Sequence, residues 1–152
     1  MSKISAGFLP YRKTEDGLEF FLVHPAGPFY AKRDEGVWSI PKGETEGEEN
    51  LIERAKKEFK EETGQDAPIV HYIELGSVKK KDGKIIHVWT FEADLQPPFT
   101  SNHFEMEWPP RSGKKQSFPE VDKWEYFNEM TAKKKISPAQ AELIDRLIEK
   151  LS

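Results

Sequence analysis

One segment constrains the fold of this chain more than any other, an amphipathic stretch from Glu48 to Thr63 that is followed directly by Gly64. Its apolar positions recur with the period of a helix, at Leu51, Ile52, Ala55 and Phe59. This spacing predicts a helix that packs one stripe against a sheet, and the glycine provides the usual stop signal at its C-terminus. The rest of the domain must therefore supply a surface that covers that stripe.

Beside the apolar stripe, Glu58, Glu61 and Glu62 fall at i, i+3 and i+4 and share one helix face. Carboxylates at these spacings repel one another, so the arrangement costs stability unless a cation lies among them. Oxygen ligands favour a hard ion such as Mg²⁺ or Mn²⁺, and such ions commonly bridge the phosphates of nucleotide-like substrates. We therefore predict a metal site on this helix, although a solvated acidic face would have the same short pattern.

The composition predicts a folded, soluble protein. The chain has 152 residues, and we treat residues 1–152 as one domain. A formal net charge of -4 offers no broad basic field for duplex nucleic acid, and the absence of cysteine excludes disulfides and thiolate metal sites. The N-terminal residues do not form a long apolar leader, and no run approaches the ~20 apolar residues of a membrane span. We expect a cytoplasmic protein without membrane contact, either a monomer or a homodimer.

The rest of the chain alternates strand-like and helix-like patterns. Apolar runs separated by turn signals predict strands at Ile4–Tyr11, Leu18–His24, Val37–Ile40, Ile69–Val78, Ile85–Phe91 and Trp124–Phe127. Pro97–Pro119 is rich in proline and is expected to be a long irregular loop. A closing helix is expected to begin near Ser137 and to run through Leu151. This order predicts an α/β (α+β) fold with helices on a mixed sheet.

The segment from Gly43 to Gln65 resembles the Nudix box. In that pattern a glycine is followed after five residues by Glu and after seven more by Arg-Glu, an apolar residue, any residue, Glu-Glu, any residue and Gly. The positions on register are Gly43, Glu49, Glu58, Phe59, Glu61, Glu62 and Gly64. Lys57 replaces the usual arginine. This keeps the positive charge but loses the planar guanidinium fork, whose N–H groups can bind both oxygens of a carboxylate. Gln65 replaces an apolar residue. Such a long match is far more specific than a short glycine motif.

This resemblance implies a Nudix hydrolase with an α/β/α sandwich that cleaves a pyrophosphate bond in a nucleoside diphosphate linked to another group. Trp38 to Gly43 looks like the same region of the diadenosine tetraphosphate hydrolase branch, so dinucleoside polyphosphates or nucleoside triphosphates are slightly preferred. The resemblance places Mg²⁺ or Mn²⁺ on Glu58, Glu61 and Glu62 and on the Gly43 carbonyl. A glycine there permits close approach of the backbone to the helix.

Other roles are expected for residues around the box. Glu120 is our favoured general base or additional metal ligand, with Glu61 as its main competitor and Glu105 and Glu107 as weaker ones. Lys57 is counted with the catalytic residues because of its box position. Lys42 could contact a phosphate as a point charge, and Tyr30 could stack on a nucleobase, although a surface lysine and a loop anchor are ordinary alternatives.

Two alternatives to an active hydrolase stay open. A Nudix-fold module could bind nucleotides without cleaving them, and the lysine at position 57 is the residue that keeps this alternative open. A structural domain with an acidic surface helix would gain no thermal stability from Mg²⁺ or Mn²⁺.

Overall fold

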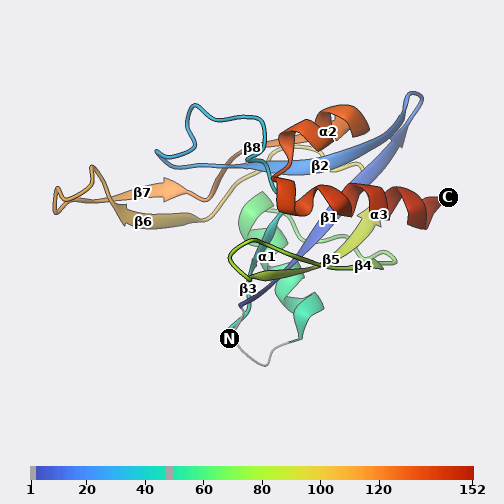
Figure 1. The fold of residues 1–152 in the computed structure, drawn as a ribbon, viewed down its shortest axis with the longest axis horizontal. Coiled ribbons are helices and arrows are strands. Elements are labelled where there is room, and N and C mark those ends of the chain that lie inside the picture. The colour runs from blue at the N-terminus through green and yellow to red at the C-terminus, as the bar shows by residue number, and fades with distance from the viewer. Residues whose placement is uncertain (1–2, 47–49) are drawn as a thin grey trace.

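The computed structural model describes residues 3–46 and 50–152, and Figure 1 shows the course of the chain. The strands are β1 (Ile4–Thr14), β2 (Gly17–Pro25), β3 (Lys42–Glu44), β4 (Ile73–Lys79), β5 (Ile85–Glu92), β6 (His103–Glu107), β7 (Lys115–Pro119) and β8 (Val121–Asn128). The helices are α1 (Leu51–Thr63), α2 (Glu129–Lys135) and α3 (Ala141–Leu151), with a 3-10 turn at Pro138–Gln140 before α3. No helix within these described ranges is long and apolar enough to cross a membrane.

The main sheet is mixed. Its strand order is β4-β5-β1-β2-β8, and β3 pairs with β1 beside β2. β1 runs parallel to β5, whereas its pairings with β2 and β3 and the β2–β8 and β4–β5 pairings are antiparallel. β1 and β2 are thus antiparallel neighbours, as are β4 and β5, and the strands predicted at Ile4–Tyr11, Leu18–His24 and Ile85–Phe91 belong to this sheet.

Alternation along β1 distributes its side chains between two apolar cores. Ala6 and Phe8 belong to a core that they share with Ala55 and Phe59 of α1. Leu9 and its neighbours on that face belong to a second core with Leu143, Ile144 and Leu147 of α3. Because successive strand residues point to opposite faces, both faces are covered by helices. The predicted α/β/α sandwich is confirmed.

The predicted strand at Val37–Ile40 was wrong. Those residues make isolated bridges, Val23 with Ser39 and Trp38 with Ile136, and belong to none of the strands. The strand forms instead after Pro41, where β3 pairs with β1 and brings Gly43 opposite Ala6. Proline ended the predicted strand for a sound local reason, but pairing with β1 extends the backbone directly beyond it.

The prediction of an irregular loop over Pro97–Pro119 was also wrong. β6 and β7 pair as a separate two-stranded sheet, and Figure 1 shows this hairpin projecting away from the main body. In β6, the partly buried Phe104 and Met106 alternate with exposed glutamates, which is the period of a strand. The prolines of this segment lie outside the strands or at the end of β7, so they delimit the hairpin rather than prevent it.

Three smaller differences from the sequence predictions concern α2, the start of β4 and the start of the closing helix. The short helix α2 was not predicted because its seven residues contain too few apolar positions to show a helical period. The expected strand from Ile69 begins only at Ile73. Ser137 precedes the 3-10 turn and makes no side-chain capping bond, so the closing α-helix begins later, at Ala141.

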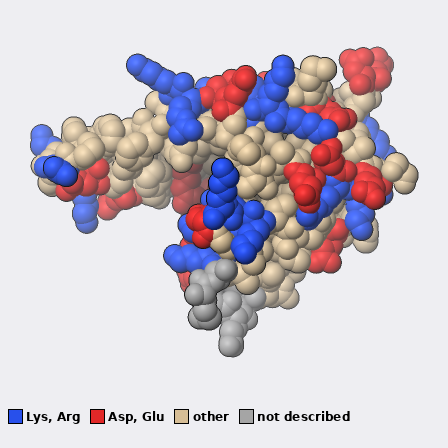
Figure 2. Space-filling view, viewed as in Figure 1, with Lys and Arg blue, Asp and Glu red and all other residues tan. Residues whose placement is uncertain are grey.

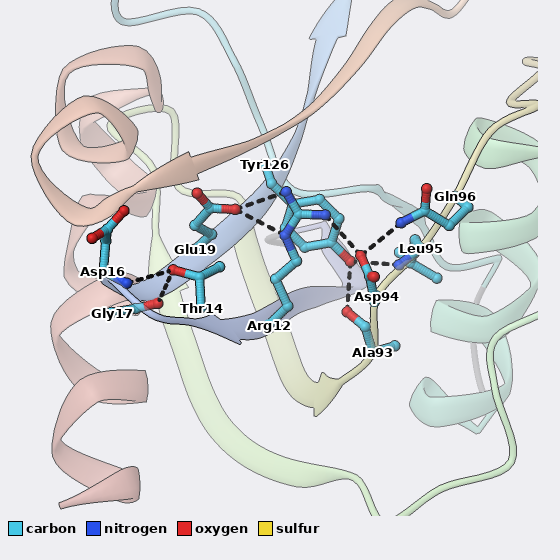
Figure 3. A network of polar contacts seen from close by, with 10 residues as sticks. All are labelled: Arg12, Thr14, Asp16, Gly17, Glu19, Ala93, Asp94, Leu95, Gln96 and Tyr126. Carbon is cyan, nitrogen blue, oxygen red and sulfur yellow. Dashed lines mark hydrogen bonds and ion pairs between the residues drawn. The ribbon is translucent and has the colours of Figure 1, made fainter.

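A network of polar contacts ties the far end of the sheet together (Figure 3). The Arg12 guanidinium contacts Glu19 on β2 and Asp94 after β5, at 2.8 Å and 2.7 Å, and lies over the Tyr126 ring of β8. The Tyr126 hydroxyl donates to the Ala93 carbonyl at 2.7 Å and accepts from another backbone N–H of the same linker. We call Arg12, Glu19, Asp94 and Tyr126 the Arg12 network.

Candidate functional site

The ends of α1 are fixed, which holds the box carboxylates in one register. At the N-terminus, the Asn50 side chain accepts the Ile52 backbone N–H at 3.0 Å. At the C-terminus, Gly64 adopts a left-handed conformation with a φ of 79° and donates to the Lys60 carbonyl at 2.8 Å. A side chain at position 64 would also collide with Thr100. The predicted helix is thus confirmed for the part that the structure describes, and Glu48 and Glu49 lie outside the described residues.

Glu58 is held between β3 and the first turn of its own helix. Only 8% of its surface is exposed, and its carboxyl group lies so close to Gly43 that any Cβ at that position would collide with it. Glycine therefore lets β3 approach the helix, as the box position led us to expect. On the helix side, Arg54 Nη1 donates to Glu58 Oε1 at 3.0 Å.

Glu62 and Lys42 face each other across the junction of α1 and β3. The backbone N–H of Lys42 favours the charged form of the Glu62 carboxylate. Burial raises the pKa of Glu62 to about 8, opposed by the charge of Lys42 and reinforced by those of Glu120 and Glu58. Burial likewise lowers the pKa of the Lys42 amine, and Glu62 acts against that shift. Each group thus stabilises the charge of the other, but burial prevails at both.

Backbone hydrogen bonds bring Glu120 to this junction. Its N–H donates to the Asn102 carbonyl at 2.8 Å, and its carbonyl accepts from Ala26 at 3.0 Å. Asn102 in turn donates to the Glu61 carbonyl at 2.8 Å, which links Glu120 to the last turn of α1. Burial raises the pKa of Glu120, the charge of Glu61 raises it further, and Lys42 lowers it. The charge of Glu61 thereby influences the protonation of a residue almost sixty positions away in the chain.

We call Glu58, Glu61, Glu62 and Glu120 the acidic cluster. Burial also raises the pKa of Glu58, against the hydrogen bond from Arg54 and together with the charge of Glu61. As the described side chains stand, no three or more Asp, Glu or His residues surround one point in metal-binding geometry. The donor chemistry nevertheless fits a hard divalent cation, because crowded and partly desolvated carboxylates are the groups whose mutual repulsion such an ion relieves.

A pocket of about 310 Å³ opens beside this cluster, at the Lys42 side. It is lined by Pro25, Tyr30, Arg33, Gly36, Val37, Ser39, Lys42, Lys80, Ser137 and Gln140. Its described lining contains three cations, Arg33, Lys42 and Lys80, and no acidic residue, although Lys80 also lies close enough to Asp82 to lower the pKa of that carboxyl group. Figure 2 shows Lys and Arg side chains gathered over the turn between β4 and β5, which carries Lys80. The structure thus brings the two predicted substrate residues, Tyr30 and Lys42, to one pocket.

Lys57 lies on the same helix as the predicted metal ligands, four residues before Glu61. Its side chain is exposed on α1, and in the part of the chain that the structure describes it forms no ion pair. Its catalytic assignment rested on the box position and stays a prediction. Of the two weaker base candidates, Glu105 and Glu107, both are exposed on β6, and Glu107 accepts the Arg111 backbone N–H at 2.7 Å.

Two further residues lie near the site, Arg54, which was missed from the sequence, and His24. Arg54 could have been found, because it lies four residues before Glu58 on the same helix face. His24 had no local signal: its ring nitrogens lie 2.6 Å from Asp122 Oδ1 and 2.6 Å from the Arg33 carbonyl oxygen, and it is 1% exposed. It links the pocket loop to β8 close to Glu120.

The chain thus combines a mixed sheet between helices with a carboxylate-rich helix that packs against a glycine-containing strand. The family model described as the NUDIX domain matches residues 1–147. The chain therefore belongs to the Nudix family, which confirms the predicted family and the prediction of a Nudix hydrolase, a pyrophosphohydrolase.

Solved structures show the same fold. The C. elegans Ap4A hydrolase in a binary complex aligns with a TM-score of 0.69 at 18% identity, over 97% of this chain and 97% of that chain. The NUDIX domain of Shewanella oneidensis NrtR, complexed with ADP ribose, gives 0.68 at 15% identity, over 100% and 90%. The MutT protein from Methanosarcina mazei Go1 gives 0.65 at 16% identity, over 99% and 96%. No curated protein matches the chain at a significant level.

Proposed function

We propose that the protein is a Mg²⁺- or Mn²⁺-dependent hydrolase of nucleotide-type pyrophosphates, with dinucleoside polyphosphates slightly preferred over nucleoside triphosphates. The observation that carries this proposal is the juxtaposition of opposite charges. The acidic cluster can hold a cation, and the neighbouring pocket presents Arg33, Lys42 and Lys80 to an anion. A substrate that combines a metal-bound diphosphate with further phosphate fits both halves.

In this proposal the metal is held by Glu58, Glu61 and Glu62 and by the Gly43 carbonyl. When bound, the ion neutralises phosphate oxygens and lowers the pKa of an attacking water. The protein contributes the fixed register of α1, the close approach of Gly43 to Glu58, and the Lys42 backbone N–H, which favours the charged form of Glu62. These contacts hold the donors in place before the substrate arrives, which reduces the reorganisation that catalysis requires.

Glu120 is our first candidate for the group that accepts a proton from water. Its raised pKa makes it a stronger base than an ordinary glutamate, and its backbone is held by Asn102 and Ala26. Glu61 is the main alternative, and the exposed Glu105 and Glu107 are weaker ones. A proton accepted by Glu120 would neutralise its carboxylate. The positive charge of Lys42 would then stabilise a phosphate group instead of the Glu120 carboxylate.

The pocket determines the substrate class in this proposal. Lys42 and Lys80 would contact phosphates beyond the cleaved bond, and the Tyr30 ring would stack on a base. The names of two structural neighbours, an Ap4A hydrolase and a domain complexed with ADP ribose, support a nucleotide of this kind. At about 310 Å³ the pocket is near the lower limit for a ligand site, which suits one nucleotide moiety.

The decisive test is an assay of the purified protein with Mg²⁺ or Mn²⁺ against diadenosine tetraphosphate, ATP and ADP-ribose, with chromatographic identification of the products. We expect cleavage at a phosphoric anhydride and the highest kcat/KM for diadenosine tetraphosphate. Lys80→Ala should raise KM for this substrate several-fold. Lys79→Ala should not, because Lys79 is the last residue of β4 and lies outside the pocket lining. Equal effects of the two substitutions on KM would show that the pocket is not part of the substrate site.

A second function is favoured by one specific observation. Lys57 stands at the box position where the family has arginine, so the protein could be a nucleotide-binding module without turnover. In that case calorimetry would show nucleotide binding, while every diphosphate in the panel would remain intact.

A further inference from the structure

Arg54 occupies an unusual position for a cation. It lies in the first turn of α1, near the positive end of the helix dipole, yet it is only 6% exposed. Its guanidinium donates to Glu58, which is itself almost buried against Gly43. The Glu58 carboxyl group therefore has a fixed charged partner on one side and the β3 backbone on the other.

Lys57, at the box position, cannot serve Glu58 in the same way. Residues 54 and 58 are four apart and share a helix face, whereas adjacent residues 57 and 58 point about 100° apart around the axis. Lys57 is exposed, so water solvates its ammonium. The planar fork that the lysine lacks is present one turn earlier, on Arg54.

Helix stability alone does not account for this arginine. A cation in the first turn is opposed by the dipole, and an ion pair with the cation before the acid is the weaker of the two orders on a helix. Burial of both partners adds a desolvation cost that a well-packed apolar pair would avoid. What the pair does provide is a defined orientation for a carboxylate in the acidic cluster.

We propose that Arg54 is a positioning residue: it supplies, from one turn earlier in α1, the guanidinium that the Nudix box places at position 57, and it fixes the Glu58 carboxylate for the metal. This inference rests on the proposed function, because it assigns Glu58 to the metal. It explains how the chain can carry lysine at position 57 without losing an oriented Glu58. Arg54 contacts neither the metal nor the substrate in this role.

The test measures Mn²⁺ binding by isothermal titration calorimetry, together with kcat, KM and the melting temperature of the metal-free protein. Arg54→Lys keeps the charge and loses the fork, and Arg54→Gln loses both. Lys60→Gln is the matched control, since Lys60 is an exposed cation on the same helix that pairs with Asp66. We expect Arg54→Lys to weaken Mn²⁺ binding and to lower kcat by about 10-fold each, with KM unchanged, as for other residues that orient metal ligands. The Lys60→Gln variant should match the wild type.

A purely structural Arg54 would give a different result. In that case Arg54→Lys would lower the melting temperature of the metal-free protein while Mn²⁺ affinity and kcat stayed at wild-type values, and the proposal would be overturned. A tenfold gain in kcat from Lys57→Arg alone would overturn it too, because it would show that Arg54 does not replace the guanidinium group that position 57 lacks. If Arg54→Gln does not fold, Arg54→Lys decides the question. Wild-type protein that binds no Mn²⁺ would refute the proposed function as well, whereas wild-type binding with unaffected Arg54 variants refutes this inference alone.

Discussion

The Arg12 network and the acidic cluster both gather charged groups from distant parts of the chain, but they balance those charges differently. In the network, Arg12 lies between Glu19 and Asp94, so each carboxylate has a cation within hydrogen-bonding distance. Burial alone would lower the pKa of the Arg12 guanidinium, and hydrogen bonds to the two carboxylates raise it above its ordinary value. The charged form is thus the favoured one.

The acidic cluster contains four carboxylates, and its neighbouring cations are Arg54, beside Glu58, and Lys42, beside Glu62 and Glu120. Burial raises the pKa of these three glutamates. The charged forms are disfavoured there in the protein alone. The network therefore stabilises the fold by its own contacts, whereas burial disfavours full ionisation of the cluster, a cost that the cation of the proposed function would relieve.

Removing one carboxylate from the cluster should give the largest effect. Glu62→Gln deletes a ligand charge, so we expect kcat to fall by at least about 100-fold, since even residues that merely orient metal ligands contribute 10–100-fold. The metal-free protein should become more stable, by about 2–4 °C per kcal/mol gained, because glutamine resembles the protonated form that the site favours. Steady-state kinetics with Mg²⁺ and thermal melting in EDTA measure the two effects.

Glu53→Gln is the control for this prediction, because Glu53 is an exposed acid on the same helix that pairs with Lys56. It should leave kcat and the melting temperature close to those of the wild type. Unaltered turnover in Glu62→Gln would refute the assignment of Glu62 to the metal. Lower stability in EDTA would instead show that the cluster is balanced in the same way as the Arg12 network.

The pH dependence of stability should separate the two regions next. The folded pKa of Glu62 is about 8, above its ordinary 4.5, so between these values the folded state holds a proton that the unfolded state has lost. This contribution to stability is complete below pH 4.5 and is lost as the pH rises through 8. In EDTA, the melting temperature of the wild type should therefore fall more between pH 6 and pH 9 than that of Glu62→Gln. Parallel curves for the two proteins would contradict the prediction.

Much of the fold follows from local sequence patterns. The period of Leu51, Ala55 and Phe59 predicted α1, and Gly64 predicted its end. The failures have a common physical cause. β3 exists because β1 offers hydrogen bonds beyond Pro41, and the β6–β7 hairpin exists because two polar segments pair with each other. Such stabilisation depends on a distant partner and leaves little local trace.

For the site, the sequence was informative on the helix and weak away from it. Glu58, Glu61 and Glu62 could be placed on one face because helix geometry fixes their spacing. The same rule would have found Arg54. The pocket could not be predicted, because Arg33, Lys80 and Gln140 come from three separate elements that only the folded chain brings together. The same holds for His24, whose two partners, Asp122 and the Arg33 carbonyl, depend on the folded chain.

Within the Arg12 network, Tyr126→Phe should have the larger effect on stability. It leaves the Ala93 carbonyl and the Leu95 N–H without their hydroxyl partner, so we expect a loss of about 1–3 kcal/mol. Burial also raises the pKa of Tyr126 to about 12 from 10.0, so the stability it contributes is lost as the pH rises from 10 through 12. Denaturant unfolding should show that the difference between the two proteins narrows in that range, while kcat near neutral pH is unchanged. A constant difference would show that the hydroxyl proton does not matter.

Arg12→Gln should have the smallest effect and tests the comparison directly. The Arg12 side chain is 31% exposed, so its ion pairs are screened by water and its loss should cost about 1 kcal/mol, including the contact with the Tyr126 ring. Since this cation is paired within the network and lies outside the acidic cluster, Mn²⁺ affinity should not change. Urea unfolding with and without Mn²⁺ measures both quantities on one protein. If the variant bound Mn²⁺ more weakly than the wild type, the two regions would be energetically coupled, and the contrast between a self-sufficient network and a cation-dependent cluster would no longer hold.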